Sequence, residues 1–424
     1  MSSSSNIIVF IHRPEYNERM KRLQAFKFEL MPTGEQQRKM LRFSGCSRFV
    51  YNKALVLQKE NFEAGNKFMT YVSMASHLPL WKRDLKFSWL KEAPSQALQH
   101  ALKDLEKAFR NFFAKRADFP SFKRRGSGGS FRYPDPKQFK LEQKNSRIFL
   151  PKLGWLRYHN SRCVLGDLRN VTVSQSGGKW FVSIQTQREV IATSSGATSA
   201  IGIDVGIARF ATMSDAQSIA PLNSFKKHQQ CLARYQRRMS RKVKFSCNWK
   251  KAKAKVQKVH TDIANARKDF LHKTTTVISK NHALVCIEDL QVRNMSRSSK
   301  GNSEQHGKKV RQKAGLNRAI LDQGWGEFRR QLEYKMLWNN GILLAVPPHN
   351  TSRTCPCCHH ISKENRLTQT EFLCVSCGYE NNADVVGAIN ILERGHRLLA
   401  CGELVQSGLS AKQEPIEVTQ VQAA

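Results

Sequence analysis

The chain has 424 residues, and its 70 lysines and arginines against 33 aspartates and glutamates give a formal net charge of +37 at pH 7. That excess is too large for an ordinary solvated surface and implies a polyanionic partner, nucleic acid above all. A membrane surface is the alternative, but no stretch approaches a spanning length and the N-terminus resembles no signal peptide. The length allows two or three domains, each with its own core.

The N-terminal third changes pattern at residue 35. Residues 1–21 lack periodicity and are predicted to be a disordered tail. Residues 24–31 alternate apolar and polar side chains, which predicts a strand that Pro32 and Gly34 end. From 35 to 113 apolar residues recur at three- and four-residue steps, which predicts a unit of three or four helices.

A basic segment at 114–130 follows, with two phenylalanines and a proline among five lysines and arginines. This mixture suits a surface that follows a sugar-phosphate backbone and stacks bases, although a solvated linker is the alternative. Short strand patterns separated by turns then predict a small antiparallel barrel. The early strand would belong to this barrel, so the helical unit would be an insertion into it. The predicted strands cover residues 139–141, 147–150, 155–158, 171–173 and 180–185.

Small polar residues at 194–200 indicate a domain boundary, after which I-G-I-D-V-G-I-A-R-F-A-T-M predicts a buried strand, a turn and a second strand. Residues 226–268 are helical in character and hold fifteen lysines and arginines with one acid, Asp262. A charge run is usually a solvated face, but this density favours a helix held against a nucleic-acid backbone. The remaining predictions are a strand at 282–290, a mobile loop at 294–313, an amphipathic helix at 325–338, a strand at 341–346 and a disordered tail at 399–424.

Two cysteine pairs with the same two-residue spacing predict a zinc site. The ligands would be Cys355, Cys358, Cys374 and Cys377, and four thiolates leave no open position, so this Zn²⁺ would be structural. Cys357 could compete, but only the pair with Cys358 reproduces the spacing of the second pair. The other cysteines of the eleven show no pairing pattern, which fits a reducing cytoplasm.

Three carboxylates stand where a metal-dependent nuclease needs them. Asp204 and Glu288 end apolar strands, and Asp384 begins a helix. Hydrolysis of a phosphodiester by two divalent ions needs carboxylates from separate elements to share the cations, and Mg²⁺ prefers such oxygen ligands. Each acid alone could be a turn residue, a strand end or a helix N-cap. The order strand–Asp, strand–Glu, helix–Asp is that of ribonuclease-H-like nucleases.

Eight segments carry a resemblance to a known family. They are S-R-F-V-Y-N at 47–52, L-P-K-L-G-W at 150–155, I-G-I-D-V-G-I at 201–207, I-E-D-L at 287–290, D-Q-G-W-G-E-F at 322–328, Q-L-E-Y-K at 331–335, T-S-R-T-C-P-C-C at 351–358 and C-G-Y-E-N-N-A-D-V-V-G-A-I-N-I at 377–391. In these segments, and in order over residues 24 to 395, the sequence resembles the TnpB (OrfB) family of transposon-encoded RNA-guided nucleases, which are related to compact type V CRISPR effectors.

The resemblance implies an α+β multidomain fold. A wedge-like β-barrel (22–34 and 114–195) would carry a helical recognition insertion (35–113). An RNase H-like (RuvC) α/β nuclease domain (196–350 and 380–398) would follow and carry a zinc ribbon (351–379). The family's catalytic acids fall on Asp204, Glu288 and Asp384, and its zinc ligands on the four cysteines. Two departures, His359 for a usual Gly and Gly387 for a usual Ala, touch none of them.

The implied function is RNA-guided cleavage of double-stranded DNA next to a short motif, with a guide RNA from the transposon end, one Zn²⁺ and two Mg²⁺. A monomer with one RNA, in a prokaryotic cytoplasm at the nucleoid, is expected. Candidate nucleic-acid contacts are Tyr71, Gln99, Lys123, Arg124, Arg125, Arg237 and Arg238. Alternatives are a CRISPR effector of the same architecture, a transposase that joins strands, and a guided binder that does not cut, although such a binder would be expected to have lost an acid.

Overall fold

The computed structural model describes residues 19–126, 128–191, 196–302, 305–366 and 368–400. The chain divides into two compact units on either side of the bond between Val190 and Ile191. None of the described helices is long and apolar enough to cross a membrane.

The predicted tails, 1–21 and 399–424, lie largely outside the described residues. Their inner ends are ordered, because residues 19–21 begin the first strand and residues 399–400 end the last helix. The tail predictions were therefore too long by a few residues at these two ends.

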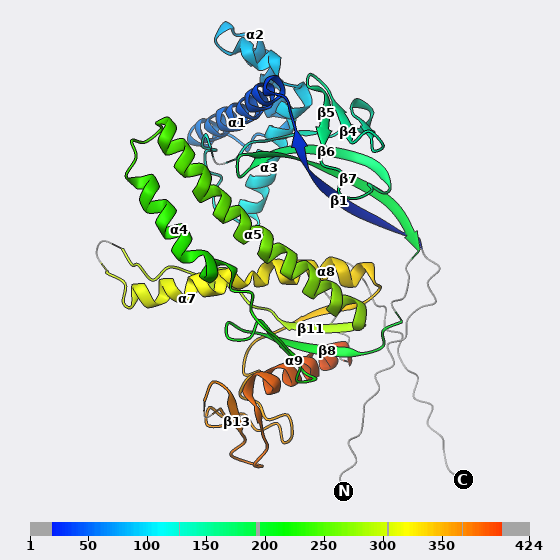
Figure 1. Ribbon diagram of the computed structural model, residues 1–424, viewed down its shortest axis with the longest axis vertical. Helices are drawn as coiled ribbons and strands as arrows, with labels where there is room; N and C mark the ends of the chain where they lie inside the picture. Colours follow the sequence, from blue (N-terminus) through cyan, green and yellow to red (C-terminus); the bar gives the residue numbers. More distant parts are fainter. Residues whose placement is uncertain (1–18, 127, 192–195, 303–304, 367, 401–424) are drawn as a thin grey trace. The chain divides into compact units, whose positions relative to one another are not determined.

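The N-terminal unit is organised around a seven-stranded sheet in the order β2-β6-β7-β1-β5-β4-β3 (Figure 1). The strand predicted at 24–31 is confirmed as β1, the central strand, and every predicted strand after it is found. Gly177 and Gly178, at φ +58° and +83°, form the two-residue turn between β6 and β7. The strands are β1 (Arg19–Met31), β2 (Ser130–Tyr133), β3 (Lys140–Glu142), β4 (Arg147–Leu150), β5 (Gly154–Tyr158), β6 (Asp167–Ser176) and β7 (Lys179–Ile191).

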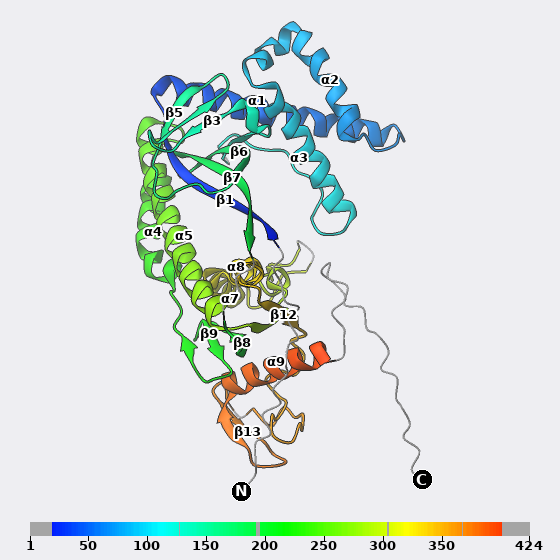
Figure 2. The ribbon, with the colours of Figure 1, turned by 90° about the vertical axis from the view of Figure 1, so that its right-hand side faces the viewer.

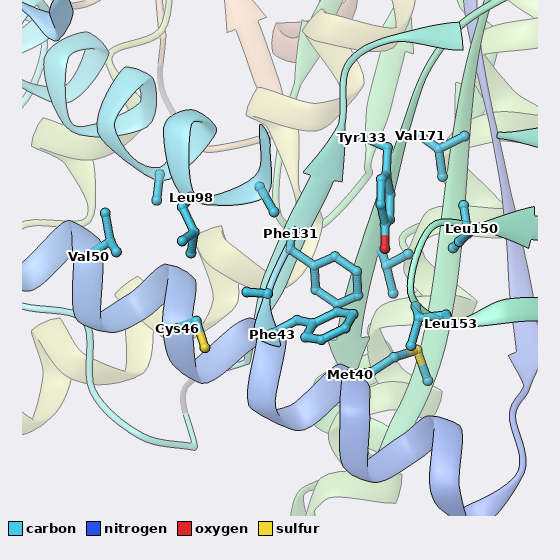
Figure 3. Close-up of a cluster of buried hydrophobic side chains, with 14 of the residues drawn as sticks. Met40, Phe43, Cys46, Val50, Leu98, Phe131, Tyr133, Leu150, Leu153 and Val171 are labelled. Atoms are coloured by element: carbon cyan, nitrogen blue, oxygen red, sulfur yellow. The ribbon is translucent and has the colours of Figure 1, made fainter. Parts of the chain in front are cut away.

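The helices predicted between 35 and 113 are confirmed, and all lie between β1 and β2 in the sequence. Thr33 and Gln36 begin the first helix with reciprocal side-chain to backbone hydrogen bonds. Figure 3 shows Met40 and Phe43 of this helix facing the β2 side chains, and the rings of Phe43 and Phe131 meet edge to face at 5.6 Å. The helices are α1 (Gly34–Glu63), α2 (Tyr71–Arg83), α3 (Ser95–Phe113) and two 3₁₀ helices, η1 (Leu85–Glu92) and η2 (Pro136–Gln138), the latter between β2 and β3.

The C-terminal unit has a five-stranded sheet in the order β10-β9-β8-β11-β12. Strands β8, β11 and β12 are parallel, while β9 and β10 run antiparallel to β8. Their near-continuous apolar sequences fit strands that are covered on both faces. The mixed α/β architecture predicted for this half is confirmed. The strands are β8 (Ala200–Val205), β9 (Ala211–Met213), β10 (Ser218–Ile219), β11 (Leu284–Glu288) and β12 (Ile342–Val346).

Among the described residues, five helices lie between β10 and β12 in the sequence. The basic segment predicted to be helical forms a hairpin, α4 (Ser224–Ser240) with α5 (Cys247–Asn281). The loop predicted at 294–313 was wrong at both ends, because α6 (Val292–Met295) occupies its start and α7 (Val310–Gln323) its end. Helix α8 is confirmed at Trp325–Trp338.

The D-Q-G-W motif anchors the basic hairpin. The buried carboxylate of Asp322, at the end of α7, accepts hydrogen bonds from the backbone N–H groups of Phe225 and Lys226 in the first turn of α4. It also accepts one from Arg267 of α5 at 2.7 Å. Because a carboxylate at a helix N-terminus satisfies otherwise unpaired donors, Asp322 fixes the base of the hairpin.

The zinc-ribbon segment lies between β12 and the last helix, α9 (Ala383–Ala400). It contains a two-stranded sheet, β13 (Glu371–Leu373) with β14 (Glu380–Asn382), and β14 leads directly into α9. Helix α9 packs on β8, β11 and β12, and Figure 2 shows the ribbon beside its N-terminal end.

Candidate active site and metal centre

The C-terminal ends of two parallel strands bring the first two acids together. In the β8–β11 register Ile203 lies opposite Ile287, so Asp204 and Glu288 are the next residues on neighbouring strands. Neighbouring strands lie only about 4.8 Å apart, and parallel strands end at the same edge of a sheet. Asp384 reaches this edge from the first turn of α9, which crosses β8.

Asp204 lies directly against α9. A Cβ atom at Gly387 would lie 3.0 Å from its Oδ2 atom, so the carboxylate occupies the space that the missing side chain leaves. Burial, with the carboxylates of Glu288 and Asp384 beside it, raises the pKa of Asp204 to about 7, although Arg366 opposes the shift. A buried carboxylate with two further carboxylates beside it forms a donor set that favours cations.

Two groups that have no recognisable sequence pattern act on Glu288, one through a hydrogen bond and one through its charge. The hydroxyl of Thr351, which is buried, donates to its Oε1 atom at 2.6 Å. Burial raises the pKa of Glu288, while this hydrogen bond and the guanidinium of Arg394 oppose the shift. The neighbouring Asp289 takes no part in the acid cluster named here and forms an ion pair with Arg329 of α8.

An arginine of the ribbon segment faces the acids. A guanidinium nitrogen of Arg366 lies 4.0 Å from a carboxylate oxygen of Asp384, and its charge also acts on Asp204. Its role could not be predicted from the sequence, because an arginine between two cysteine pairs has no local pattern that links it to acids elsewhere in the chain.

A buried amide connects the ribbon segment to α9. Asn390 donates from Nδ2 to the backbone carbonyls of Thr351 and Thr354, both at 2.7 Å. Thr351 in turn donates to Glu288, so one chain of contacts runs from α9 through the start of the ribbon to the second acid. The T-S-R-T letters of the motif at 351–354 were the only sequence signal for this link.

The four predicted cysteine ligands converge. Their Sγ atoms all lie within 4.8 Å of one another, with Cys355 and Cys377 at 3.6 Å and Cys358 and Cys374 at 3.5 Å. Four sulfurs about 2.3 Å from a tetrahedral Zn²⁺ would be about 3.8 Å apart, so the donor set fits this ion. Cys357, the competing ligand, is exposed and lies outside the group.

The backbone explains one departure from the family pattern. His359 has φ +59°, the left-handed region in which glycine is least strained. Its Nδ1 atom lies 3.8 Å from the carboxylate of Glu393 on α9. The knuckle therefore keeps the turn that a glycine would form.

The predicted nucleic-acid contacts are distributed over both units. In the N-terminal unit, Tyr71 begins α2 and has the ammonium of Lys103 over its ring at 4.8 Å, and Gln99 is exposed on α3. Lys123 lines a cleft of about 270 Å³, which neither Tyr71 nor Gln99 lines. The remaining candidates are exposed: Arg124 and Arg125 in the N-terminal unit, and Arg237 and Arg238 on α4.

Comparison with known proteins gives three family matches. A model described as "Probable transposase" of the OrfB family matches residues 171–299, a Cas12f1-like TNB domain matches 325–391, and a helix-turn-helix domain of the OrfB family matches 20–67. The last segment contains β1 and the single helix α1 in this structure, so it has no second helix to enter a DNA groove beside the first.

Full-length relatives are also found. The "Putative RNA-guided DNA endonuclease InsQ" of Escherichia coli is 59% identical over 404 residues, 95% of this chain and 100% of that protein. A "Putative RNA-guided DNA endonuclease" of Streptomyces pristinaespiralis is 34% identical over 93% of this chain and 97% of that one. Among solved structures, a Cas12f1–sgRNA–target DNA complex shares the fold at TM-score 0.51 and 12% identity, over 88% of this chain and 98% of that one. The chain therefore belongs to the TnpB (OrfB) family.

Proposed function

We propose that this chain is an RNA-guided DNA endonuclease, encoded by a transposon, that cuts DNA next to a short motif specific to its element. The observation that carries the proposal is the convergence of Asp204, Glu288 and Asp384 in a chain with a net charge of +37. The relatives named as RNA-guided DNA endonucleases match over nearly the whole chain, which supports the same activity here.

The three acids would hold two Mg²⁺ ions. Bound there, the ions would activate a water molecule and neutralise the charge that develops on the leaving oxygen. The hydrogen bond from Thr351 orients Glu288, and the positive charge of Arg394 favours its ionised form. Glu288 would thus meet the cations as a carboxylate. Arg366 faces the same acids and offers its guanidinium to a phosphate that comes to the site.

The four cysteines would hold one Zn²⁺ that takes no part in the chemistry. Four thiolates close the coordination shell, and the apolar side chains around them pack against the first turns of α9. Zinc would thus fix the helix that carries Asp384.

The partners would be one guide RNA from the transposon end and a double-stranded DNA target, bound by a protein monomer at the nucleoid. Pairing between guide and target would supply sequence specificity, while the basic surface holds the heteroduplex by shape and backbone charge. The candidate contacts in the N-terminal unit and on α4 would act at this step. The domain limits expected from the sequence place the recognition domains before residue 196 and the nuclease domain after it, and α4 would add backbone contacts from the nuclease domain.

The experiment that tests the proposal begins with purification of the chain from cells that carry its flanking DNA, followed by sequencing of the bound RNA. One abundant RNA from the element's end should direct cutting of a matching target, and Asp204→Ala should abolish cutting while RNA and target binding persist. Unimpaired cutting by Asp204→Ala, or heterogeneous RNA that moderate salt removes, would overturn it.

The match of residues 325–391 to a Cas12f1-like TNB domain favours a second candidate, a compact type V CRISPR effector. Its guide would map to a repeat array and not to a transposon end, so the same RNA sequencing separates the two. A transposase would leave joined strands in place of hydrolysed ends, which analysis of the products detects.

A further inference from the structure

A cleft of about 820 Å³ in the N-terminal unit lies outside every site assigned so far. One stripe of α1 forms its floor, at the three- and four-residue steps 42, 45, 49, 52 and 56, and η1 with the loop around Phe122 forms its walls. Its volume lies within the range of about 300–1,000 Å³ typical of ligand sites.

Aromatic rings give the cleft its character. Phe49 is the centre of the group, with ring centroids 5.1 Å from Phe87 and 5.0 Å from Trp89. Trp89 is 39% exposed and Phe122 is 45% exposed, so both rings can be reached from outside. The indole N–H of Trp89 already donates to the carbonyl of Lys86 at 3.1 Å, which leaves the faces of the ring as its recognition surface.

Cations accompany the rings. The ammonium of Lys53 lies 4.4 Å from the centroid of Phe87, and that of Lys59 lies 5.0 Å from the centroid of Phe122. Glu92 is the single carboxylate among the residues that line the cleft, and Arg42 pairs with it at 3.1 Å. The walls of the cleft are therefore mainly aromatic, and Lys53 and Lys59 border them as a positive rim.

The wall that carries Phe122 is held in place. Asn52 of α1 accepts the backbone N–H of Lys123 at 2.8 Å and donates to its carbonyl at 3.0 Å. These two hydrogen bonds fix the loop next to Phe122 before any ligand arrives. A fixed wall lowers the entropy lost when a ligand binds.

We propose that this cleft binds unpaired nucleotides of the DNA strand that a guide displaces, by stacking their bases on Trp89 and Phe122 while the rim cations hold the phosphates. Aromatic faces with surrounding cations are the means by which proteins hold single strands of any sequence. The displaced strand differs at every target, so a surface that stacks bases without reading their hydrogen-bonding edges suits it. This inference rests on the proposed function, because only strand opening by a guide produces that ligand.

The test uses the full-length chain carrying Asp204→Ala, so that DNA is bound and not cut, and measures binding of a fluorescent oligodeoxythymidine at several salt concentrations. Trp89→Ala and Phe122→Ala should each weaken binding about tenfold, and together about a hundredfold. The control is Phe62→Ala. It removes an 81% exposed ring of α1 that lies outside the cleft, so the affinity for the oligomer should not change.

Salt separates stacking from charge. Trp89→Ala or Phe122→Ala should lower the affinity equally at every salt concentration, so the slope of log affinity against log salt should not change. Lys59→Met should reduce the magnitude of that slope by about 0.7, the value for one phosphate contact to a single strand. A DNA oligomer that carries 5-iododeoxyuridine should cross-link to the peptides that contain Trp89 or Phe122. Trp89→Phe should retain most of the affinity, and thermal melting shows whether each variant is folded.

Loss of affinity for the DNA oligomer, whether or not an oligouridine loses affinity as well, supports the proposal. Three results would overturn the proposal. The Trp89 and Phe122 variants could lose affinity for oligouridine only, they could bind the DNA oligomer as well as Phe62→Ala does, or the cross-links could form only outside the cleft. Guided cutting by the chain with Asp204 intact is measured separately. If the chain cuts guided targets and Trp89→Ala still binds the oligomer with full affinity, the proposal for the cleft is wrong and the proposed function stands. If Trp89→Ala loses affinity but the chain with Asp204 intact never cuts a guided target, the proposed function is wrong and the cleft still binds single strands.

Discussion

Asp204 carries a carboxylate whose charge the fold does not favour in the absence of metal. An unfolded aspartate loses its proton near pH 3.8, whereas burial and two neighbouring acids raise the pKa of Asp204 to about 7 in the folded chain. Between these values the folded state binds more protons than the unfolded state, so the free energy of unfolding falls as the pH rises from about 4 to 7.

Asp204→Asn should therefore raise the melting temperature of the metal-free protein at pH 8, because a neutral amide avoids both burial of charge and repulsion. The gain should shrink as the pH approaches 4, where the aspartate is neutral in both states. Thermal melts in a chelator across pH measure this. Adding Mg²⁺ should stabilise the original chain and leave the variant unchanged. A variant that melts lower at pH 8 would contradict the electrostatic account of this site.

Thr351 is a positioning residue for Glu288. Replacing it with Val keeps its shape but removes a hydroxyl that donates at 2.6 Å, so the pKa of Glu288 should rise further. A hydrogen bond to a charged group contributes about 1.5–3 kcal/mol, so cutting should slow by about ten- to a hundredfold and the acidic limb of the pH–rate profile should move to higher pH. Thr351→Ser keeps the hydroxyl, so it should show the original cutting rate and the original pH–rate profile. Equal rates and profiles for Thr351→Val and Thr351→Ser would rule out this role.

Sequence alone predicted the three acids and the four cysteines as candidates because each stands at a recognisable place, a strand end, a helix start or a repeated spacing. Arg366, Thr351 and Asn390 could not be found in that way. Their roles come from partners between 18 and 63 residues away, as with Arg366 and Asp384 or Thr351 and Glu288. Contacts across such separations exist only once the fold has formed.

At the scale of elements, α9 can approach the sheet because glycines line the contact. A Cβ at Gly202 of β8 would lie 2.1 Å from the carbonyl oxygen of Ala388, and one at Gly395 would lie 2.1 Å from the sulfur of Cys286. The glycine of I-G-I-D is thus needed for close packing of helix on strand, which brings Asp384 to the other two acids.

Gly202→Ala should force α9 away from β8 and slow cutting by about a hundredfold, since a displacement of about 1 Å at a catalytic group has an effect of that size. It should also weaken binding of Mg²⁺ and lower the melting temperature. The control is Gly315→Ala on α7, where a Cβ meets nothing within 4 Å and alanine favours the helix. Cleavage rates and melting curves of the two variants test this, and full activity of Gly202→Ala would contradict it.

The ribbon supports α9 from the other side. Cys355, Cys374 and Phe372 form one apolar cluster with Ala383 and Val386, on either side of Asp384. Loss of the proposed Zn²⁺ should therefore loosen the third acid, although the four cysteines would take no part in cutting.

Cys374→Ser should lose the proposed Zn²⁺, melt at lower temperature and cut poorly, because three thiolates would hold the ion less well and the cluster would lose its centre. Cys357→Ser is the matched control, since this exposed thiol lies in the same knuckle but outside the ligand group. Metal content by atomic absorption and cleavage of a guided target are the measurements. Full activity in a zinc-free Cys374→Ser protein would rule out the supporting role.

Element boundaries show where sequence patterns are weak. Helix α8 was predicted to the residue because its aromatic and apolar positions repeat clearly. The first turn of α7 was instead predicted to be loop, and the rest of this helix was not predicted. Its sequence, V-R-Q-K-A-G-L-N-R-A-I-L-D-Q, is largely polar, and much of its support comes from tertiary contacts such as Asp322 with Arg267. Propensity alone could not select a helix there.

At the scale of the whole molecule, charge should control how firmly RNA is held. Arg237 and Arg238 are exposed on α4, in a hairpin whose sequence is rich in lysine and arginine. Replacing both with Gln should reduce the slope of log affinity against log salt for the guide RNA by about 1.4, because two phosphate contacts are lost.

Lys273→Gln on α5 is the control for that pair. Its ammonium already has a partner in Asp269 at 2.8 Å, so its loss should change the slope little. Filter binding at four salt concentrations gives the slopes, and equal effects of the two changes would mean that the hairpin contacts RNA only through its average charge.

The connection of the last acid to the zinc ribbon has a consequence for how the enzyme is made. Synthesis completes residues 19–190, which have a core of their own, before it reaches Asp204, and it adds the ribbon and Asp384 last of the three acids. During synthesis the N-terminal unit would therefore be able to fold and bind RNA before the site that cuts is complete. A chain shortened before residue 384 would keep the N-terminal unit but lack the third acid, so it would leave uncut any nucleic acid that it binds.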